Sequence, residues 1–244
     1  MRRSVTLFVF ASAILLASSA LATTINITSV TGSWQGSNPA PGPGLTITND
    51  SPTSTISWGD PAPPDEKQSS YVFTSAVPPP VSAVVPPGPS DWLKFGDFTH
   101  NNFPIYEPLL LSVDLRLALA MTVDGSAVSQ SFVYHLTHEE TYNFGDCKYG
   151  NPGDKPCPDR VTISPPTAGV FEIGGVLYTL ELSFADTPGG PAINEFITQE
   201  ENSNKANIFG RFTSDTSSIP EPASLVLLGT GLLGLVGLRK RVKK

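Results

Sequence analysis

The chain has 244 residues, 15% of them charged, and its formal net charge is −7. The charge is uneven, because residues 23–218 hold eight basic and 21 acidic residues and so carry a net charge of about −13. Nucleic-acid binding needs clustered Lys and Arg for the phosphates, so this composition excludes nucleic acid as a partner. These residues suffice for one sizeable core and are few for two.

The N-terminus has the pattern of a secretion signal. Arg2 and Arg3 precede an apolar run over residues 5–16, which is followed by the small-x-small triplet Ala20-Leu21-Ala22. This order is typical of a cleaved signal peptide. We therefore expect signal peptidase to remove residues 1–22 between Ala22 and Thr23 and the protein to be exported. The alternative is an uncleaved membrane helix, for which the apolar run is short.

Residues 23–213 are predicted to be β-structure throughout. Residues 109–123 are apolar at every second position, which favours a strand over a helix because a strand places the intervening polar residues on one face. Asp124-Gly125 then predicts a hairpin. The same alternation recurs in residues 127–141 and 174–186. Shorter strands are expected at 25–30, 54–58, 70–74, 92–98, 161–164, 196–199 and 207–212.

Proline-rich segments interrupt these strands. Residues 38–44, 60–64 and 76–91 are expected to be loops or extended connectors, because proline removes a backbone donor and favours polyproline geometry. Many strands separated by turn residues, without an amphipathic helix, predict an all-β, jelly-roll-like β-sandwich. Residues 214–219 are expected to be a linker to a C-terminal hydrophobic helix.

The two cysteines, Cys147 and Cys157, lie in a segment rich in Gly, Pro and Asp. Export places them in an oxidising compartment, so we expect them to form a disulfide. A redox-active pair is disfavoured, because the two-residue spacing of thioredoxin-like motifs is absent.

Two polar segments suggest a calcium site, because calcium takes six to eight oxygen ligands. The candidate ligands are Asp97, Asn101, Asn102, Glu140 and Asn143, with Glu139, Asp154 and Asp159 as further carboxylates nearby in the sequence. The alternative is that these residues stabilise turns through hydrogen bonds to the backbone. A zinc site on His135 and His138 is disfavoured, since on a strand these two side chains point to opposite faces. No other cofactor is expected.

Enzymatic activity is not expected. Glu139 and Glu140 are adjacent on a predicted strand, so they cannot form the facing carboxylate pair of a glycosidase, and no nucleophile motif is present. Trp34, Trp58 and Trp92 could stack on sugar rings, or they could complete the core.

The C-terminal segment combines three features. Pro220-Glu221-Pro222 precedes an apolar span at 223–238, and five basic residues follow it. A 16-residue helix is about 24 Å long, so this span crosses a bilayer only marginally. The combination at 220–244 resembles the PEP-CTERM sorting signal of Gram-negative bacteria. The resemblance implies that an exosortase removes the tail, whereas the alternative is a permanent membrane anchor.

Four segments of the exported part resemble the choice-of-anchor K domain. They are residues 95–105, 137–143, 157–163 and 196–212. The resemblance implies a surface location and no known reaction. We therefore expect a non-enzymatic surface or matrix protein, associated with biofilm and exopolysaccharide, that resides transiently in the inner membrane before its tail is removed. The alternatives are a calcium-dependent carbohydrate-binding module and a polysaccharide hydrolase.

Overall fold

The computed structural model describes most of the exported part of the chain, and all of the regular elements in the described residues are strands. The predicted signal peptide up to residue 21 and the tail from residue 216 lie outside this description. The described residues are 22–63, 66–76, 81–85, 89–143, 145–150, 156–164, 170–173, 176–185 and 193–215.

The predicted hairpin forms the centre of one sheet. β9 (Ser112–Val123) and β10 (Ser126–Glu139) pair antiparallel across Asp124 and Gly125. Both turn residues have positive φ, 47° and 86°, as a two-residue type I′ turn requires. The apolar residues of both strands are buried at every second position, so the period-two prediction is confirmed.

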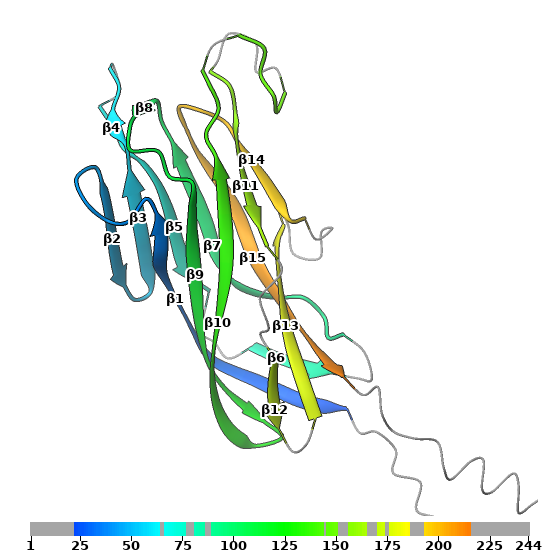
Figure 1. Cartoon of the computed structure of the whole chain (residues 1–244). Coiled ribbons are helices and arrows are strands. Elements are labelled where there is room, and N and C mark those ends of the chain that lie inside the picture. The colour runs from blue at the N-terminus through cyan, green and yellow to red at the C-terminus, as the bar shows by residue number, and fades with distance from the viewer. Residues whose placement is uncertain are drawn as a thin grey trace, which may run out of the picture. The chain divides into compact units, whose positions relative to one another are not determined.

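This sheet has six strands, all paired antiparallel. Its order is β14 (Glu195–Thr198), β11 (Asp159–Ile163), β10, β9, β1 (Thr23–Asn38) and β6 (Val81–Val85). The long strands β1, β9 and β10 run along the molecule and curve together at its lower end (Figure 1).

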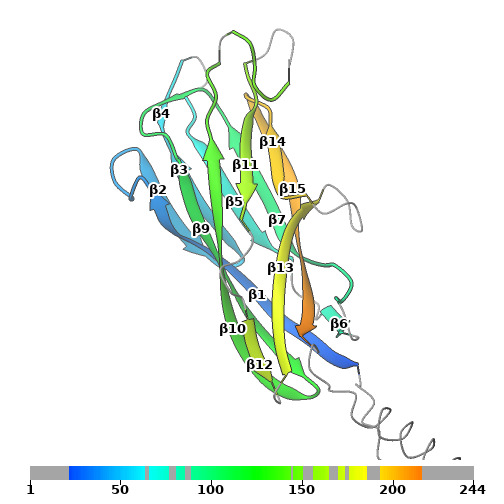
Figure 2. The same cartoon turned by 45° about the vertical axis from the view of Figure 1, so that its right-hand side comes forward.

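The second sheet has seven antiparallel strands and faces the first. Its order is β12 (Val170–Ile173), β13 (Val176–Ala185), β15 (Asn202–Asp215), β7 (Leu93–Asn102), β5 (Ser69–Ser75), β3 (Thr53–Trp58) and β2 (Leu45–Asp50). Two short strands, β4 (Asp60–Pro61) and β8 (Ile105–Tyr106), pair beside it. The turned view in Figure 2 shows the two layers of strands.

Apolar side chains from the inner faces of both sheets form one continuous core. Its packing is close, as the Phe73 ring illustrates. Gly32 of β1 and Gly96 of β7 leave room for this ring, because a Cβ at these positions would lie 2.1 Å and 2.5 Å from its carbons. The fold is therefore an all-β sandwich, whereas the jelly-roll connectivity stays a prediction.

Some of the proline-rich segments were predicted wrongly. Residues 81–85 form the edge strand β6, with Ala83 and Val85 buried, although 76–91 were expected to connect strands. An edge strand tolerates nearby prolines because one of its sides needs no ladder hydrogen bonds. Strands β2 and β12 were also not anticipated.

Several strand ends that carry buried polar residues lie at the end of the sandwich shown at the top of Figure 1. There β7 and β10 end, β11 begins, and the chain turns from β14 into β15. Among the described residues, no helix has the length and apolar character needed to cross a bilayer, and the predicted span 223–238 lies outside them.

Candidate metal site

The inward-facing side chains become polar at this end of the sandwich. Along β10 the buried series Phe132, Tyr134 and Leu136 continues with His138. Along β7 the inward positions that follow Phe98 are His100 and Asn102, both fully buried. Since buried polar groups are normally hydrogen-bonded, these residues should belong to a network.

His138 connects the two sheets. Its Nδ1 forms a short hydrogen bond with the hydroxyl of Tyr71 on β5, and its Nε2 lies 3.2 Å from Glu140 Oε2. Burial lowers the pKa of His138 to about 4, so the ring is neutral at pH 7. A neutral ring has one donor and one acceptor. One of the two ring nitrogens of His138 therefore donates and the other accepts in these two hydrogen bonds.

Asp159 enters the cluster from the first position of β11. Its Oδ1 accepts a hydrogen bond of 2.7 Å from the backbone N–H of Thr141. Its strand partner is Thr198, whose hydroxyl lies 2.8 Å from His100 Nδ1 and whose carbonyl accepts from Asn102 Nδ2 at 3.3 Å. Asp159 is thus held in place on a frame that includes strands of both sheets.

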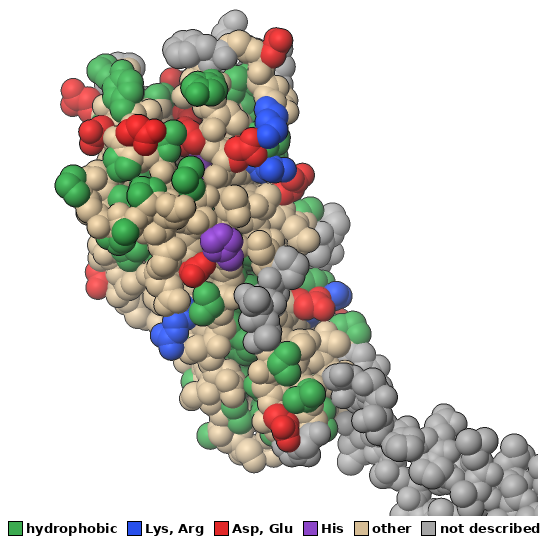
Figure 3. Space-filling view, viewed as in Figure 1, with side chains coloured by type: hydrophobic (Ala, Val, Ile, Leu, Met, Phe, Trp, Pro, Cys, Tyr) green, Lys and Arg blue, Asp and Glu red, His purple; other side chains and the backbone are tan. Residues whose placement is uncertain are grey.

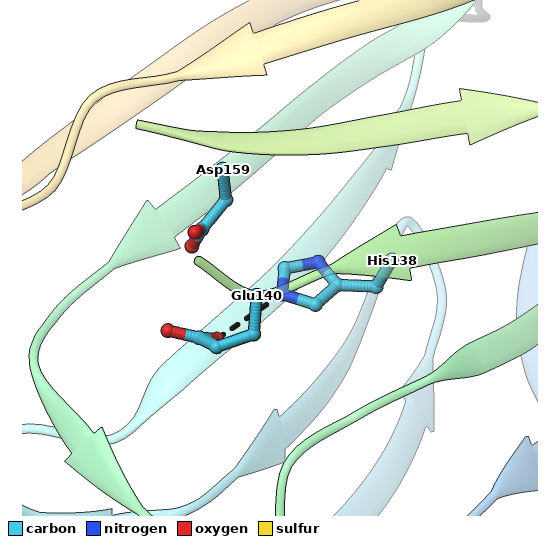
Figure 4. Close-up of side chains that lie close together, drawn as sticks. All are labelled: His138, Glu140 and Asp159. Atoms are coloured by element: carbon cyan, nitrogen blue, oxygen red, sulfur yellow. Dashed lines mark hydrogen bonds and ion pairs between the residues drawn. The ribbon is translucent and has the colours of Figure 1, made fainter. Parts of the chain in front are cut away.

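Three potential metal-ligating atoms converge here. One atom each from His138, Glu140 and Asp159 lies within 4.8 Å of the others, and Figure 4 shows these side chains side by side at the ends of their strands. Glu200 adds a further carboxylate, because it continues the inward series Phe196 and Thr198 beyond β14.

The carboxyl groups of this cluster resist ionisation. Burial is the main cause, and it raises the pKa of Glu140 to about 7. Burial and then the neighbouring Glu140 carboxylate raise the pKa of Asp159 to about 7. Burial, then Asp159 and Glu140, raise the pKa of Glu200 to about 8. No Lys or Arg is among the causes of these shifts, so a bound cation is the group that would favour the ionised forms.

Several buried oxygens of the cluster lack a well-formed hydrogen bond. Among the described residues, Asn102 Oδ1 and Asn143 Oδ1 have no hydrogen-bond partner. Asp159 Oδ2 and the Glu200 carboxylate have at most weak ones, from the Asn102 side chain to Asp159 and from the Glu201 backbone and the Asn143 side chain to Glu200. Asn143 belongs to this group because its side chain forms a hydrogen bond with Glu200 that lowers the pKa of that carboxyl. His100 Nε2 is the one nitrogen of the cluster without such a bond. The arrangement is rich in free oxygen ligands, which is the chemistry of a hard cation.

The structure brings together Asn102, Glu140 and Asn143 of the predicted calcium ligands, but it separates Asp97 and Asn101 from them. Asp97 is exposed and pairs with Lys94 at 2.7 Å. Asn101 Nδ2 donates to Ser70 Oγ at 3.0 Å on the outer face of the sheet. The correction follows from strand alternation, since β7 continues to Asn102 rather than ending at Phe98.

Sequence reasoning missed Glu200 and the proximity of His138 to the carboxylates. The signal for Glu200 was the period-two series Phe196, Thr198, Glu200, which puts it on the core side. As predicted, His135 and His138 point to opposite faces. His135 is exposed and lies 2.8 Å from Asp114, whereas His138 is buried.

The described residues of the loop from β10 to β11 contact the start of β11 beside Asp159. The predicted disulfide between Cys147 and Cys157 is confirmed. Thr141 Oγ1 donates to the Cys157 carbonyl at 3.3 Å. Glu139 faces outward and is bonded to Lys148 and to other side chains of this region. The disulfide and Glu139 therefore anchor the loop beside Asp159.

The tryptophans do not form a surface suited to sugar stacking. Trp34 and Trp58 are 2% and 0% exposed and pack with Tyr71 in the core. Trp92 is half-buried, and the guanidinium of Arg211 lies 4.6 Å from its ring centroid. Two of the three candidate stacking residues are thus core residues.

The predicted sorting triplet, Pro220, Glu221 and Pro222, lies outside the described residues. In comparisons with known proteins, residues 218–241 match the family model of the PEP-CTERM protein-sorting motif. No curated protein matches the chain. The C-terminal segment is thus a PEP-CTERM sorting motif, as its triplet, apolar span and basic end predicted.

Proposed function

We propose that the protein is an exported, non-enzymatic component of the cell surface or extracellular matrix that an exosortase releases from its C-terminal tail. The observation that carries this proposal is the PEP-CTERM sorting motif at residues 218–241. Such a motif implies export and a membrane-associated precursor. The signal-peptide pattern at residues 1–22 supports the same route.

The proposed route explains the marginal length of residues 223–238. A segment that covers only about 24 Å as a helix is a weak permanent anchor but a sufficient transient one. The basic residues from Arg239 to Lys244 would stay on the cytoplasmic side by the positive-inside rule. Cleavage near Pro220 would then leave the sandwich outside the inner membrane.

The proposed identity of the sandwich as a choice-of-anchor K domain rests on four resembling segments. In the fold these segments meet at the polar end of the sandwich. They supply His100 and Asn102, then His138 and Glu140, then Asp159, and finally Glu200. Their convergence on one cluster supports reading them as parts of a single functional unit.

The low solvent accessibility of the clustered acidic residues agrees with a matrix role without catalysis. Asp159 and Glu200 are 0% and 1% exposed, so a polysaccharide chain cannot reach their carboxyl groups in this conformation. Glu139 and Glu140 point to opposite sides, whereas a glycosidase needs two carboxylates that face each other across one cleft. The burial of Trp34 and Trp58 likewise gives no support to a lectin-like site.

Cell fractionation tests the proposal. The wild-type protein and a variant with Pro220, Glu221 and Pro222 replaced by Ala are produced in a bacterium that has an exosortase. We expect wild-type protein at the surface or in the medium and the variant in the inner membrane. Replacement of Thr216 and Ser217, which precede the motif, by Ala is the matched control. Identical distribution of the wild type and the triplet variant would contradict the proposal.

A further inference from the structure

We propose that the polar end of the sandwich interior is a calcium site centred on Glu140 and Asp159, with Asn102, Asn143 and Glu200 beside them. This inference goes beyond the sorting of the protein, because it assigns a ligand to the exported domain itself. It also differs from the set expected from the sequence, since Asp97 and Asn101 are excluded and Glu200 is included.

The donor atoms match calcium in kind and charge. The cluster offers three carboxylates and two amide oxygens, and calcium prefers six to eight oxygens from such groups, including bidentate carboxylates. The imidazole of His138 is already bonded to Tyr71 on one nitrogen and to Glu140 on the other. Oxygen ligands therefore dominate, which disfavours the softer transition metals.

The free acceptors point to a missing positive group. Asn102 Nδ2 donates to the Thr198 carbonyl, so the orientation of this amide directs Oδ1 away from that bond. Asp159 uses Oδ1 for the Thr141 N–H and leaves Oδ2 with at most a weak hydrogen bond from the Asn102 side chain. The Glu200 carboxylate, in a residue only 1% exposed, has hydrogen bonds from the Glu201 backbone and the Asn143 side chain but no cationic partner among the causes of its raised pKa. A cation bound at Glu140 and Asp159, which offer ligand atoms within 4.8 Å of each other, would offset the cost of these buried acceptors.

The ligands come from segments that are far apart in the sequence. Asn102 ends β7 in one sheet, whereas Asp159 begins β11 in the other. Glu140 and Asn143 lie in the loop that carries the disulfide, and Glu200 lies in the turn between β14 and β15. A bound ion would thus link the two sheets and the loop at one end of the sandwich.

Charge on the surface favours entry of a cation at this end. Figure 3 shows acidic side chains concentrated toward the upper part of the molecule, where the site lies below the surface. Glu140 is the carboxylate of the cluster with partial access, since its side chain is 11% exposed. A negative surface raises the local cation concentration and speeds association.

Calorimetric titration of the full-length protein in non-ionic detergent tests the proposal. The protein is freed of metal with a chelator and titrated with calcium chloride at pH 7.5. We expect saturable binding of one ion per chain. Glu200→Gln and Glu140→Gln should each weaken binding at least tenfold, since each removes a negative charge from the site. Asp97→Asn is the matched control, because it removes an exposed carboxylate on β7 outside the cluster, and it should leave the affinity unchanged.

Three results would overturn the proposal. They are no calcium binding at millimolar concentration, an equal loss of affinity in Asp97→Asn, and binding of zinc or manganese without binding of calcium. Circular dichroism of each variant in chelator reports whether it is folded. The wild-type titration decides the question even if a variant fails to fold. Its outcome is independent of tail processing, so failure here leaves the sorting proposal intact.

Discussion

Glu200→Gln should stabilise the protein without calcium, and calcium should reduce that advantage. The Glu200 carboxyl is buried, and its pKa rises from 4.5 to about 8. At pH 7 the folded state must therefore hold a proton that the unfolded chain releases. A gap of about 2.5 pH units at 1.36 kcal/mol per unit makes this cost about 3 kcal/mol. Gln has nearly the same shape and needs no proton.

In chelator at pH 7, we expect Glu200→Gln to raise the free energy of unfolding by about 2–3 kcal/mol, or Tm by roughly 5–10 °C. At pH 4.5 the gain should largely vanish, because Glu200 is then protonated to a similar extent in both states. In saturating calcium this advantage should shrink. At 100 times the wild-type Kd, calcium stabilises the wild type by about 2.7 kcal/mol and a variant that binds tenfold more weakly by about 1.4 kcal/mol, so the difference falls by about 1.3 kcal/mol.

Thermal unfolding followed by circular dichroism measures all of these conditions, with Asp97→Asn as the control that should follow the wild type throughout. If Glu200→Gln is less stable than the wild type in chelator at pH 7, the carboxylate already has good partners and the reasoning from burial fails. If calcium leaves the stability difference between the two proteins unchanged, Glu200 does not contribute to calcium binding.

Three further predictions concern pH, the disulfide and core packing. In chelator the wild type should lose stability as pH rises from about 4 to about 8, because the pKa values of Glu140, Asp159 and Glu200 are raised in the folded state. Calcium affinity should increase over about pH 6–8, because fewer protons must be displaced from these carboxyl groups. Unfolding at several pH values measures the first trend, and calorimetry measures the second. Replacing Cys147 and Cys157 by Ser should cost about 2–3 kcal/mol in denaturant unfolding, since the bond closes a short loop, and a reducing agent should destabilise only the wild type. Gly32→Ala should cost about 1–3 kcal/mol in the same assay because its Cβ meets the Phe73 ring, whereas Gly42→Ala, with no atom closer than 3.9 Å, should be nearly neutral.

The strands that could be predicted are those whose alternation is long and bounded by a clear turn. Residues 109–139 showed both features, and the structure places β9, the Asp124-Gly125 turn and β10 there. The edge strand β6 could not be found in the same way, because its five residues lie between prolines. Its position is determined by pairing with β1, which is a long-range contact that local sequence does not encode.

The kinds of ligand at the site could be predicted from the sequence, but only some of the individual residues could. Asn102, Glu140 and Asn143 lie in polar segments whose side chains suit calcium, and they do come together. Asp97 was predicted from the oxygen-rich composition of its segment, whereas the observed strand directs Asp97 and Asn102 to opposite faces. Glu200 was missed because Glu201 and Asn202 beside it suggest a solvated turn, and only the packing of β14 against the core buries it.

The most direct test of the account is the intact mass of the protein recovered from cells, with mapping of its C-terminal peptide. The account predicts a mature chain that begins at Thr23 and ends near Pro220-Glu221-Pro222, because signal peptidase and exosortase remove the two ends. Recovery of the protein with Lys244 still in place would contradict it, and would identify the tail as a permanent anchor.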